Sequence, residues 1–68
     1  MAINPKGAPT ESDMAAASAL SDAALERAIL ACRKRMGRGE SDWATLRSQS
    51  ARYQVAELRG ISIPPVGA

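Results

Sequence analysis

The stretch Leu20-Ser21-Asp22-Ala23-Ala24-Leu25 decides the fold, because it carries the signals that begin a helix. Ser21 is a favoured N-cap residue, and Asp22 at the first helical position complements the positive end of the helix dipole. Leu20 precedes the cap and Leu25 lies at the fourth helical position, the spacing of a hydrophobic staple. We therefore predict that a helix begins here.

This helix is predicted to end near Met36. Arg33, Lys34 and Arg35 fall in its last turn, where cations are favoured by the negative end of the helix dipole. Gly37 follows and suits the left-handed position just beyond a helix C-terminus. Local sequence therefore specifies both ends of the helix.

The segment before it also favours a helix. Thr10-Glu11-Ser12-Asp13 offers N-cap residues, and the alanine-rich run from Ala15 to Ala19 has high helix propensity. Two interpretations stay open: a short separate helix, or one helix over about residues 11–36. Residues 1–10 contain two prolines and a glycine without apolar periodicity, so we predict a flexible or extended arm there.

A second long helix is predicted over residues 42–59. Ser41 and Asp42 repeat the Ser-Asp opening of the first helix, and Gly60 is a suitable terminator. Only the segment from Gly37 to Glu40 separates the two helices. A connection this short makes them antiparallel neighbours.

The last residues, 61–68, contain Pro64-Pro65 and are predicted to be extended. The predicted fold class is therefore all-α: a small antiparallel helical hairpin over residues 11–60, with an extended arm at each end.

The composition excludes the cross-links that usually stabilise small proteins, namely disulfides and structural metal sites. The chain has 68 residues, one Cys and no His, so an internal disulfide cannot form and a structural zinc site lacks a plausible ligand set. Of the apolar residues, 14 are alanines, which bury little area each. A small domain without disulfides or a structural metal usually needs a partner, so we expect other chains to complete the core.

The large apolar side chains point in more directions than one hairpin can bury. The apolar stripe of the first helix is wide enough to pack against one other helix, and Leu30 lies outside this stripe. The second helix has a wide apolar surface, with Trp43 and Tyr53 on one side and Val55 on an adjoining one. We expect the hairpin mate to cover one side and another chain to cover the other.

The tail carries apolar residues in a segment that has no helix of its own. These side chains either fold back over the hairpin or dock on a partner, as extended peptides do. The predicted partner-binding residues are Leu30, Trp43, Tyr53, Val55, Ile61, Ile63 and Val66.

The concentrated charge is Arg33, Lys34, Arg35 and Arg38, four cations within six residues of a chain whose net charge is +2. One interpretation is helix-dipole matching and a solvated turn. The other is a contact with phosphate or with an acidic partner at the tip of the hairpin, which Arg52 and Arg59 could extend as a basic face.

Catalysis is poorly supported by the sequence. No His is present to act as a general base, and Cys32 lies on the inward stripe, where a small buried hydrophobe is expected. We predict a non-enzymatic protein without metal or cofactor. No run of about 18–20 apolar residues exists to cross a membrane, and the N-terminus lacks a signal-peptide core.

Two functions remain. The first is a small structural or interaction subunit that completes its fold in a larger assembly, either with protein partners or as a homo-oligomer. The predicted setting is a bacteriophage virion or its host's cytoplasm, in a head–tail joining, connector-associated or capsid-stabilising role. The alternative is a small basic regulator that binds nucleic acid through Arg33 to Arg38.

In size and helical style the chain resembles small phage head–tail joining proteins of the lambda W type. Those proteins carry a β-hairpin between their helices, for which only Gly37 to Glu40 would be available here. The resemblance covers no specific motif and assigns the chain to no family.

Overall fold

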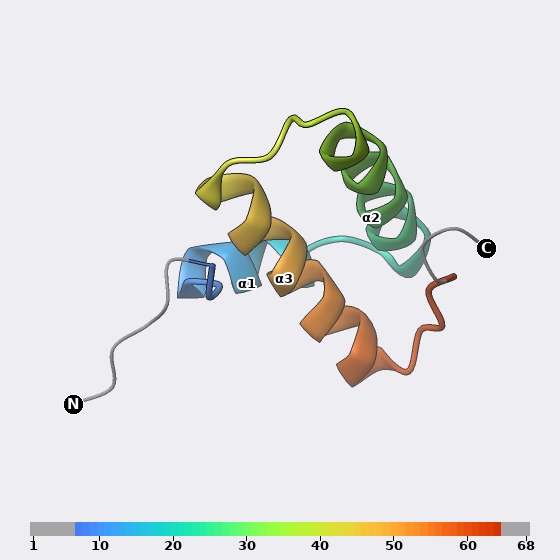
Figure 1. Ribbon diagram of the computed structural model, residues 1–68. Coiled ribbons are helices and arrows are strands. Elements are labelled where there is room, and N and C mark those ends of the chain that lie inside the picture. Colours follow the sequence, from blue (N-terminus) through green and yellow to red (C-terminus); the bar gives the residue numbers. More distant parts are fainter. Residues whose placement is uncertain (1–6, 65–68) are drawn as a thin grey trace.

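Three helices make up the part of the chain that the computed structural model describes, residues 7–64 (Figure 1). Helix α1 spans Glu11–Ser18, α2 spans Asp22–Gly37 and α3 spans Trp43–Arg59. No strand occurs within the described range, so the predicted all-α class is confirmed.

A short separate helix forms upstream, rather than one continuous helix over residues 11–36. Thr10 caps α1: its hydroxyl accepts a hydrogen bond from Asp13 N at 3.2 Å, and the Asp13 carboxylate accepts one from Thr10 N at 2.9 Å. Ser21 caps α2, where its hydroxyl accepts a hydrogen bond from Ala24 N at 3.2 Å. An N-cap residue has extended backbone angles, so the Ser21 cap interrupts the helical run.

The connection between α2 and α3 differs from the prediction by one or two residues. Gly37 is still helical, and the left-handed residue is Gly39, with φ of 87°. The helix end is longer because the amide of Gly39 donates to the Met36 carbonyl at 3.0 Å. Asp42 rather than Ser41 caps α3, accepting a hydrogen bond from the backbone amide of the third helical residue at 2.7 Å.

Helix α3 packs against both α1 and α2 (Figure 1). We expected another chain to cover the second side of this helix, but in the structure α1 covers it. The core therefore draws on all three helices. Its buried hydrophobic residues are Ala17, Leu25, Ile29, Cys32, Ala51, Val55 and Ala56.

A buried amide ties α3 to α2 within this core. The Gln49 side chain is buried, and its Nε2 donates to the Ile29 carbonyl at 3.0 Å. Its Oε1 accepts a hydrogen bond from Arg52 at 3.2 Å. Because both ends of the amide are paired, Gln49 sets the register of the two helices without leaving an unsatisfied polar group.

Arg59 joins the end of α3 to the connection between α1 and α2. Its guanidinium donates to the Ser18 carbonyl at 2.8 Å and to the Leu20 carbonyl at 2.7 Å. It also pairs with the Asp22 carboxylate at 3.1 Å. The last carbonyls of a helix lack partners within that helix, so Arg59 satisfies backbone groups at the end of α1.

Candidate protein-interaction surface

The outer face of α3 carries the most exposed large apolar side chains among residues 7–64. Trp43 is 52% exposed and Leu58 is 83% exposed. A helix turns about 100° per residue, so positions 43, 47, 50, 54 and 58 share one side of α3. We call these five residues, Trp43, Arg47, Ser50, Gln54 and Leu58, the α3 outer face.

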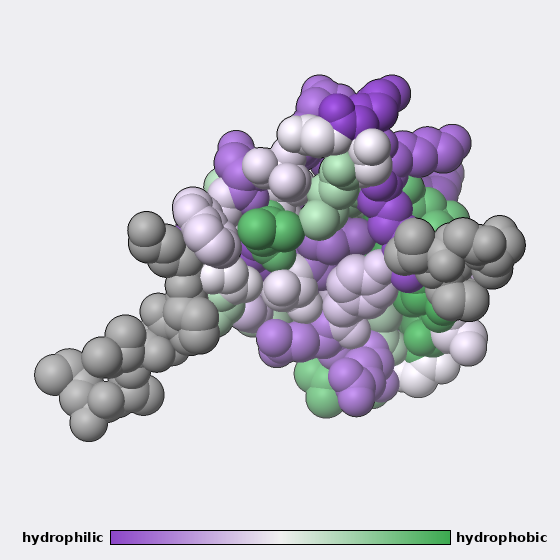
Figure 2. All heavy atoms as spheres, in the orientation of Figure 1, coloured by the Kyte–Doolittle hydropathy of each residue, from purple (hydrophilic) through white to green (hydrophobic). Residues whose placement is uncertain are grey.

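This face lies opposite the buried side of the helix. The buried residues of α3 are Gln49, Ala51, Val55 and Ala56, whereas every residue of the outer face is half-buried or exposed. In Figure 2, the surface over α3 shows green hydrophobic patches separated by white and purple ones. Arg47 and Ser50 are half-buried, and Arg47 pairs with Asp13 of α1 at 3.8 Å, so the single chain leaves this side of α3 only partly uncovered.

Trp43 begins α3 and contacts the N-terminal segment. A Cβ atom at Gly7 would lie 3.8 Å from Cζ3 of Trp43, so the chain at residues 7–9 runs beside the indole ring. These three residues are half-buried. The sequence predicted Trp43 as a partner-binding residue, and about half of the residue is exposed in the single chain. Residues 1–6 of the predicted arm lie outside the described residues.

Tyr53 and Arg33 hold the C-terminal tail against the same chain. The Tyr53 hydroxyl accepts a hydrogen bond from Arg33 Nε at 2.5 Å, and the guanidinium lies 5.4 Å from the ring centroid. Arg33 also donates to the Pro64 carbonyl. Ile61 and Ile63 are half-buried and pack against the core. Within residues 61–64, the tail therefore folds back over its own helices.

The turn into the tail follows the predicted helix terminator. Gly60 takes a left-handed conformation with φ of 72°, and the amide of Ile61 donates to the Ala56 carbonyl at 2.9 Å. This backbone geometry reverses the chain toward α2. Residues 65–68, which include the predicted partner-binding residue Val66, lie outside the described residues.

The remaining predicted partner-binding residues lie elsewhere. Val55 is buried in the core of the single chain, so its side chain cannot meet a partner without unfolding. Leu30 is half-buried on α2. The structure thus brings Arg33, Tyr53 and the tail together and separates them from Trp43.

The basic residues near the hairpin tip do not form one patch. Arg33 is bound to Tyr53 and Pro64, and Arg38 pairs with Glu40 at 3.2 Å on the exposed connection. Lys34 and Arg35 are exposed. Two cations therefore remain of the four that were predicted to meet phosphate or an acidic partner.

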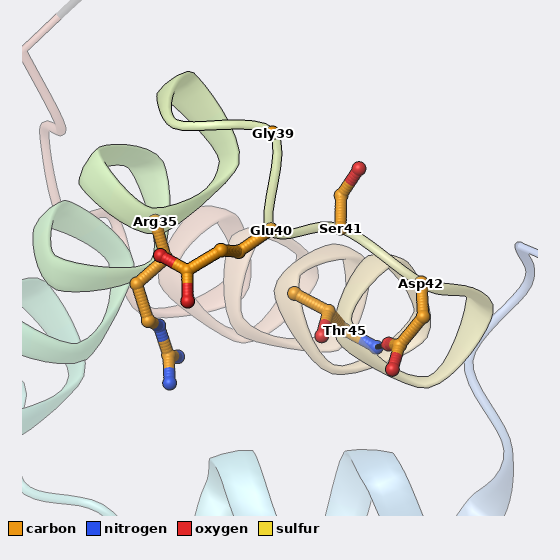
Figure 3. Close-up of a pocket in the computed structure, with 6 residues that line it drawn as sticks. All are labelled: Arg35, Gly39, Glu40, Ser41, Asp42 and Thr45. Carbon is orange, nitrogen blue, oxygen red and sulfur yellow. Dashed lines mark hydrogen bonds between the residues drawn. The ribbon is translucent and has the colours of Figure 1, made fainter.

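A shallow depression of about 430 Å³ lies at this tip (Figure 3). Its lining residues are Arg35, Gly39, Glu40, Ser41, Asp42 and Thr45. The Asp42 side chain already occupies the start of α3, where its carboxylate accepts the Thr45 amide at 2.7 Å. The lining carries two carboxylates, of Glu40 and Asp42, and one guanidinium, of Arg35, so its net charge does not favour an anion.

The two helix-capping carboxylates have lowered pKa values. The pKa of Asp13 falls chiefly because its carboxylate accepts the Thr10 backbone amide, with the Thr10 hydroxyl and the Arg47 charge adding to the effect. The pKa of Asp42 falls chiefly because its carboxylate accepts the Thr45 backbone amide. Both groups stay ionised near neutral pH, which suits capping rather than acid–base chemistry.

Among residues 7–64, no group of three or more His, Cys, Asp or Glu side chains is arranged to hold a metal ion. No helix in the same part of the chain has the length and hydropathy needed to cross a membrane. Cys32 is fully buried in the core.

Comparisons with models of known protein families, with curated proteins and with solved structures gave no match.

Proposed function

We propose that the protein is a non-enzymatic interaction subunit that completes its hydrophobic contacts within a larger assembly. The observation that carries the proposal is the α3 outer face, which exposes Trp43 and Leu58 on one side of a single helix. Large aromatic side chains such as Trp are enriched in protein–protein contact sites relative to the rest of a protein surface.

The size of the core supports the same function. Only three large aliphatic side chains, Leu25, Ile29 and Val55, are buried among residues 7–64, and the rest of the buried hydrophobic set is alanine and cysteine. Burial of a large aliphatic side chain contributes about 1.5–3 kcal/mol. A core this small gives a marginal monomer, which gains stability from a partner that covers α3.

A virion minor protein, in a head–tail joining, connector-associated or capsid-stabilising role, is the proposed setting, with the host bacterial cytoplasm as the place of synthesis. What supports it is the composition, in which 14 residues are alanine and seven of the nine cations are arginine. This composition suits a GC-rich genome.

A regulator that binds nucleic acid is the competing function. Lys34 and Arg35 are its exposed cations, whereas Arg33 and Arg38 already have intramolecular partners. Binding that depends on phosphate contacts falls steeply as salt rises.

Circular dichroism and gel-shift assays on the purified chain distinguish the two functions. We expect helicity and unfolding midpoint to rise with protein concentration or with a partner, and no salt-sensitive DNA or RNA complex. A cooperatively folded monomer that shifts nucleic acid with a steep salt dependence would overturn the proposal.

A further inference from the structure

The side of α3 opposite its outer face is polar in the first half of the helix. Thr45, Ser48 and Arg52 recur at spacings of three and four, so they lie on one side of the helix, and all three are half-buried. The second half of α3 carries the buried core residues Val55 and Ala56 on this same side. The first half therefore presents hydroxyl and guanidinium groups where the second half presents apolar ones.

A hollow of about 200 Å³ lies over these polar residues, between α2 and α3. Its lining residues are Arg35, Asp42, Ala44, Thr45, Ser48 and Arg52. It adjoins the depression at the tip, and the two share Arg35, Asp42 and Thr45. In place of Glu40, however, this hollow has Arg52. Its lining therefore carries one positive charge in excess, whereas the lining of the tip depression carries one negative charge in excess. We call it the two-arginine hollow.

Both arginines of the hollow have donors to spare. Arg35 is exposed, and its guanidinium makes no hydrogen bond or ion pair with any group that the structure describes. Arg52 uses one N–H for Gln49 Oε1 at 3.2 Å, and a guanidinium has five such donors. The hydroxyls of Thr45 and Ser48 add two further donors. Two guanidiniums and two hydroxyls from two helices therefore line one hollow.

The carboxylates near this hollow already have partners. The Asp42 carboxylate accepts the Thr45 amide at 2.7 Å, which commits it to the cap of α3. Figure 3 shows the Arg35 and Asp42 side chains at opposite ends of the tip depression, with the Thr45 side chain between them. Asp13 of α1, which lines a neighbouring hollow, pairs with Arg47 at 3.8 Å. Neither carboxylate therefore neutralises Arg35.

We propose that the two-arginine hollow binds a phosphate group, either free phosphate or a phosphate monoester. A phosphate monoester carries about 1.5–2 negative charges at neutral pH and three strong acceptor oxygens, so guanidiniums and hydroxyls can donate to it together. A water molecule takes up about 30 Å³ in the liquid, so the hollow holds about six waters, which suits a phosphate whose organic part projects into solvent. The site leaves the α3 outer face free and so goes beyond the proposed function.

Nuclear magnetic resonance titrations of the isotope-labelled full chain, at fixed pH and ionic strength, test the site. Inorganic phosphate and glycerol 3-phosphate are the two expected ligands. Dimethyl phosphate and acetate carry a single charge and represent a nucleic-acid backbone and an acidic side chain. We expect saturable shifts of the Thr45 and Ser48 amides and of the Arg35 Nε–H with the first two ligands. The singly charged probes should bind at least about five-fold more weakly, because they bring less charge.

Two substitutions remove donors from the hollow. Arg35→Gln should weaken phosphate binding about ten-fold, because one of the two cations is lost. Ser48→Ala should weaken it about three-fold through the loss of one hydroxyl. Both new residues favour a helix, and both replaced residues are exposed or half-buried, so the fold is retained. Arg27→Gln is the matched control, since Arg27 is an exposed cation of α2 outside the hollow, and it should bind phosphate as the unmodified protein does.

Phosphate shifts that do not saturate, or that are equal in Arg35→Gln and the unmodified protein, would overturn the proposal. Binding of acetate or dimethyl phosphate as tight as that of phosphate would assign the hollow to a carboxylate or a phosphodiester and would overturn it as well. None of these results bears on the proposed function, which depends on the α3 outer face. That function would fail separately if the monomer were cooperatively folded and shifted DNA.

Discussion

Replacing Arg59 by methionine should cost a large part of the stability of the single chain. The guanidinium donates to the Ser18 and Leu20 carbonyls at 2.8 and 2.7 Å, and its side chain is only 28% exposed. Hydrogen bonds to a charged group contribute about 1.5–3 kcal/mol each, a value that partial solvent exposure reduces by roughly half. The Asp22 pair adds little, since the Asp22 side chain is 74% exposed.

The expected loss is therefore about 1.5–3 kcal/mol, against a total of about 3–5 kcal/mol for a domain of this size. Methionine keeps the length of the side chain and removes only the donors. Urea unfolding followed by circular dichroism should show a lower midpoint with an unchanged slope.

Arg27→Met is the matched control, because Arg27 is an exposed cation of α2, and its loss should change stability by less than about 0.5 kcal/mol. Asp22→Asn isolates the ion pair and should cost at most about 1 kcal/mol. If Arg59→Met fell within the range of the Arg27 control, water would be satisfying the end of α1 and the role assigned to Arg59 would be refuted.

Three other perturbations test the fold. Truncation after Gly60 removes the half-buried Ile61 and Ile63 and should lower stability by about 2 kcal/mol in urea unfolding, whereas an unchanged midpoint would show that the tail does not stabilise its own helices. Ile29→Val should cost about 0.5–1.5 kcal/mol by the same measurement, and a neutral effect would argue against its complete burial. The lowered pKa of Asp42 gives stability that is complete above its unfolded pKa of about 3.9 and is lost as pH falls through the folded value. Asp42→Asn keeps a cap that does not titrate, so helicity should fall less between about pH 5 and pH 2, and identical acid curves would remove Asp42 from that transition.

The helix boundaries could be predicted because they depend on local chemistry. Ser21 caps α2 and Gly60 ends α3 in the left-handed conformation, as their positions in the sequence indicated. Whether residues 11–36 formed one helix or two depended on a competition between alanine propensity and the Ser21 cap. The sequence contained both signals but did not show which of them is stronger. In the structure two separate helices form, with Ser21 as the N-cap of α2.

Contacts between distant parts of the chain were harder to predict. Arg59 looked like an addition to a basic face, yet it binds carbonyls about 40 residues earlier in the chain. Arg33 likewise binds Tyr53 and the tail instead of projecting from the tip. A long cation can serve solvent, phosphate or a backbone carbonyl, and only the tertiary arrangement decides which partner is within reach.

The apolar faces were predicted in part. The sequence indicated that α3 has more apolar surface than one helix can cover, and Leu58 together with Trp43 remains exposed. It did not indicate that α1 would fold onto α3, because the eight residues of α1 are mostly small and show little apolar periodicity. The uncovered surface is therefore narrower than expected and is confined to the α3 outer face among the described residues.

The central claim, that the α3 outer face is a protein-contact surface, is tested most directly by sedimentation equilibrium of the unmodified protein beside Leu58→Glu. The account predicts that the unmodified protein associates, so that its mass rises above 7.1 kDa as its concentration increases, while Leu58→Glu stays at the mass of one chain. Two proteins with the same mass at every concentration, whether both monomeric or both associated, would contradict it.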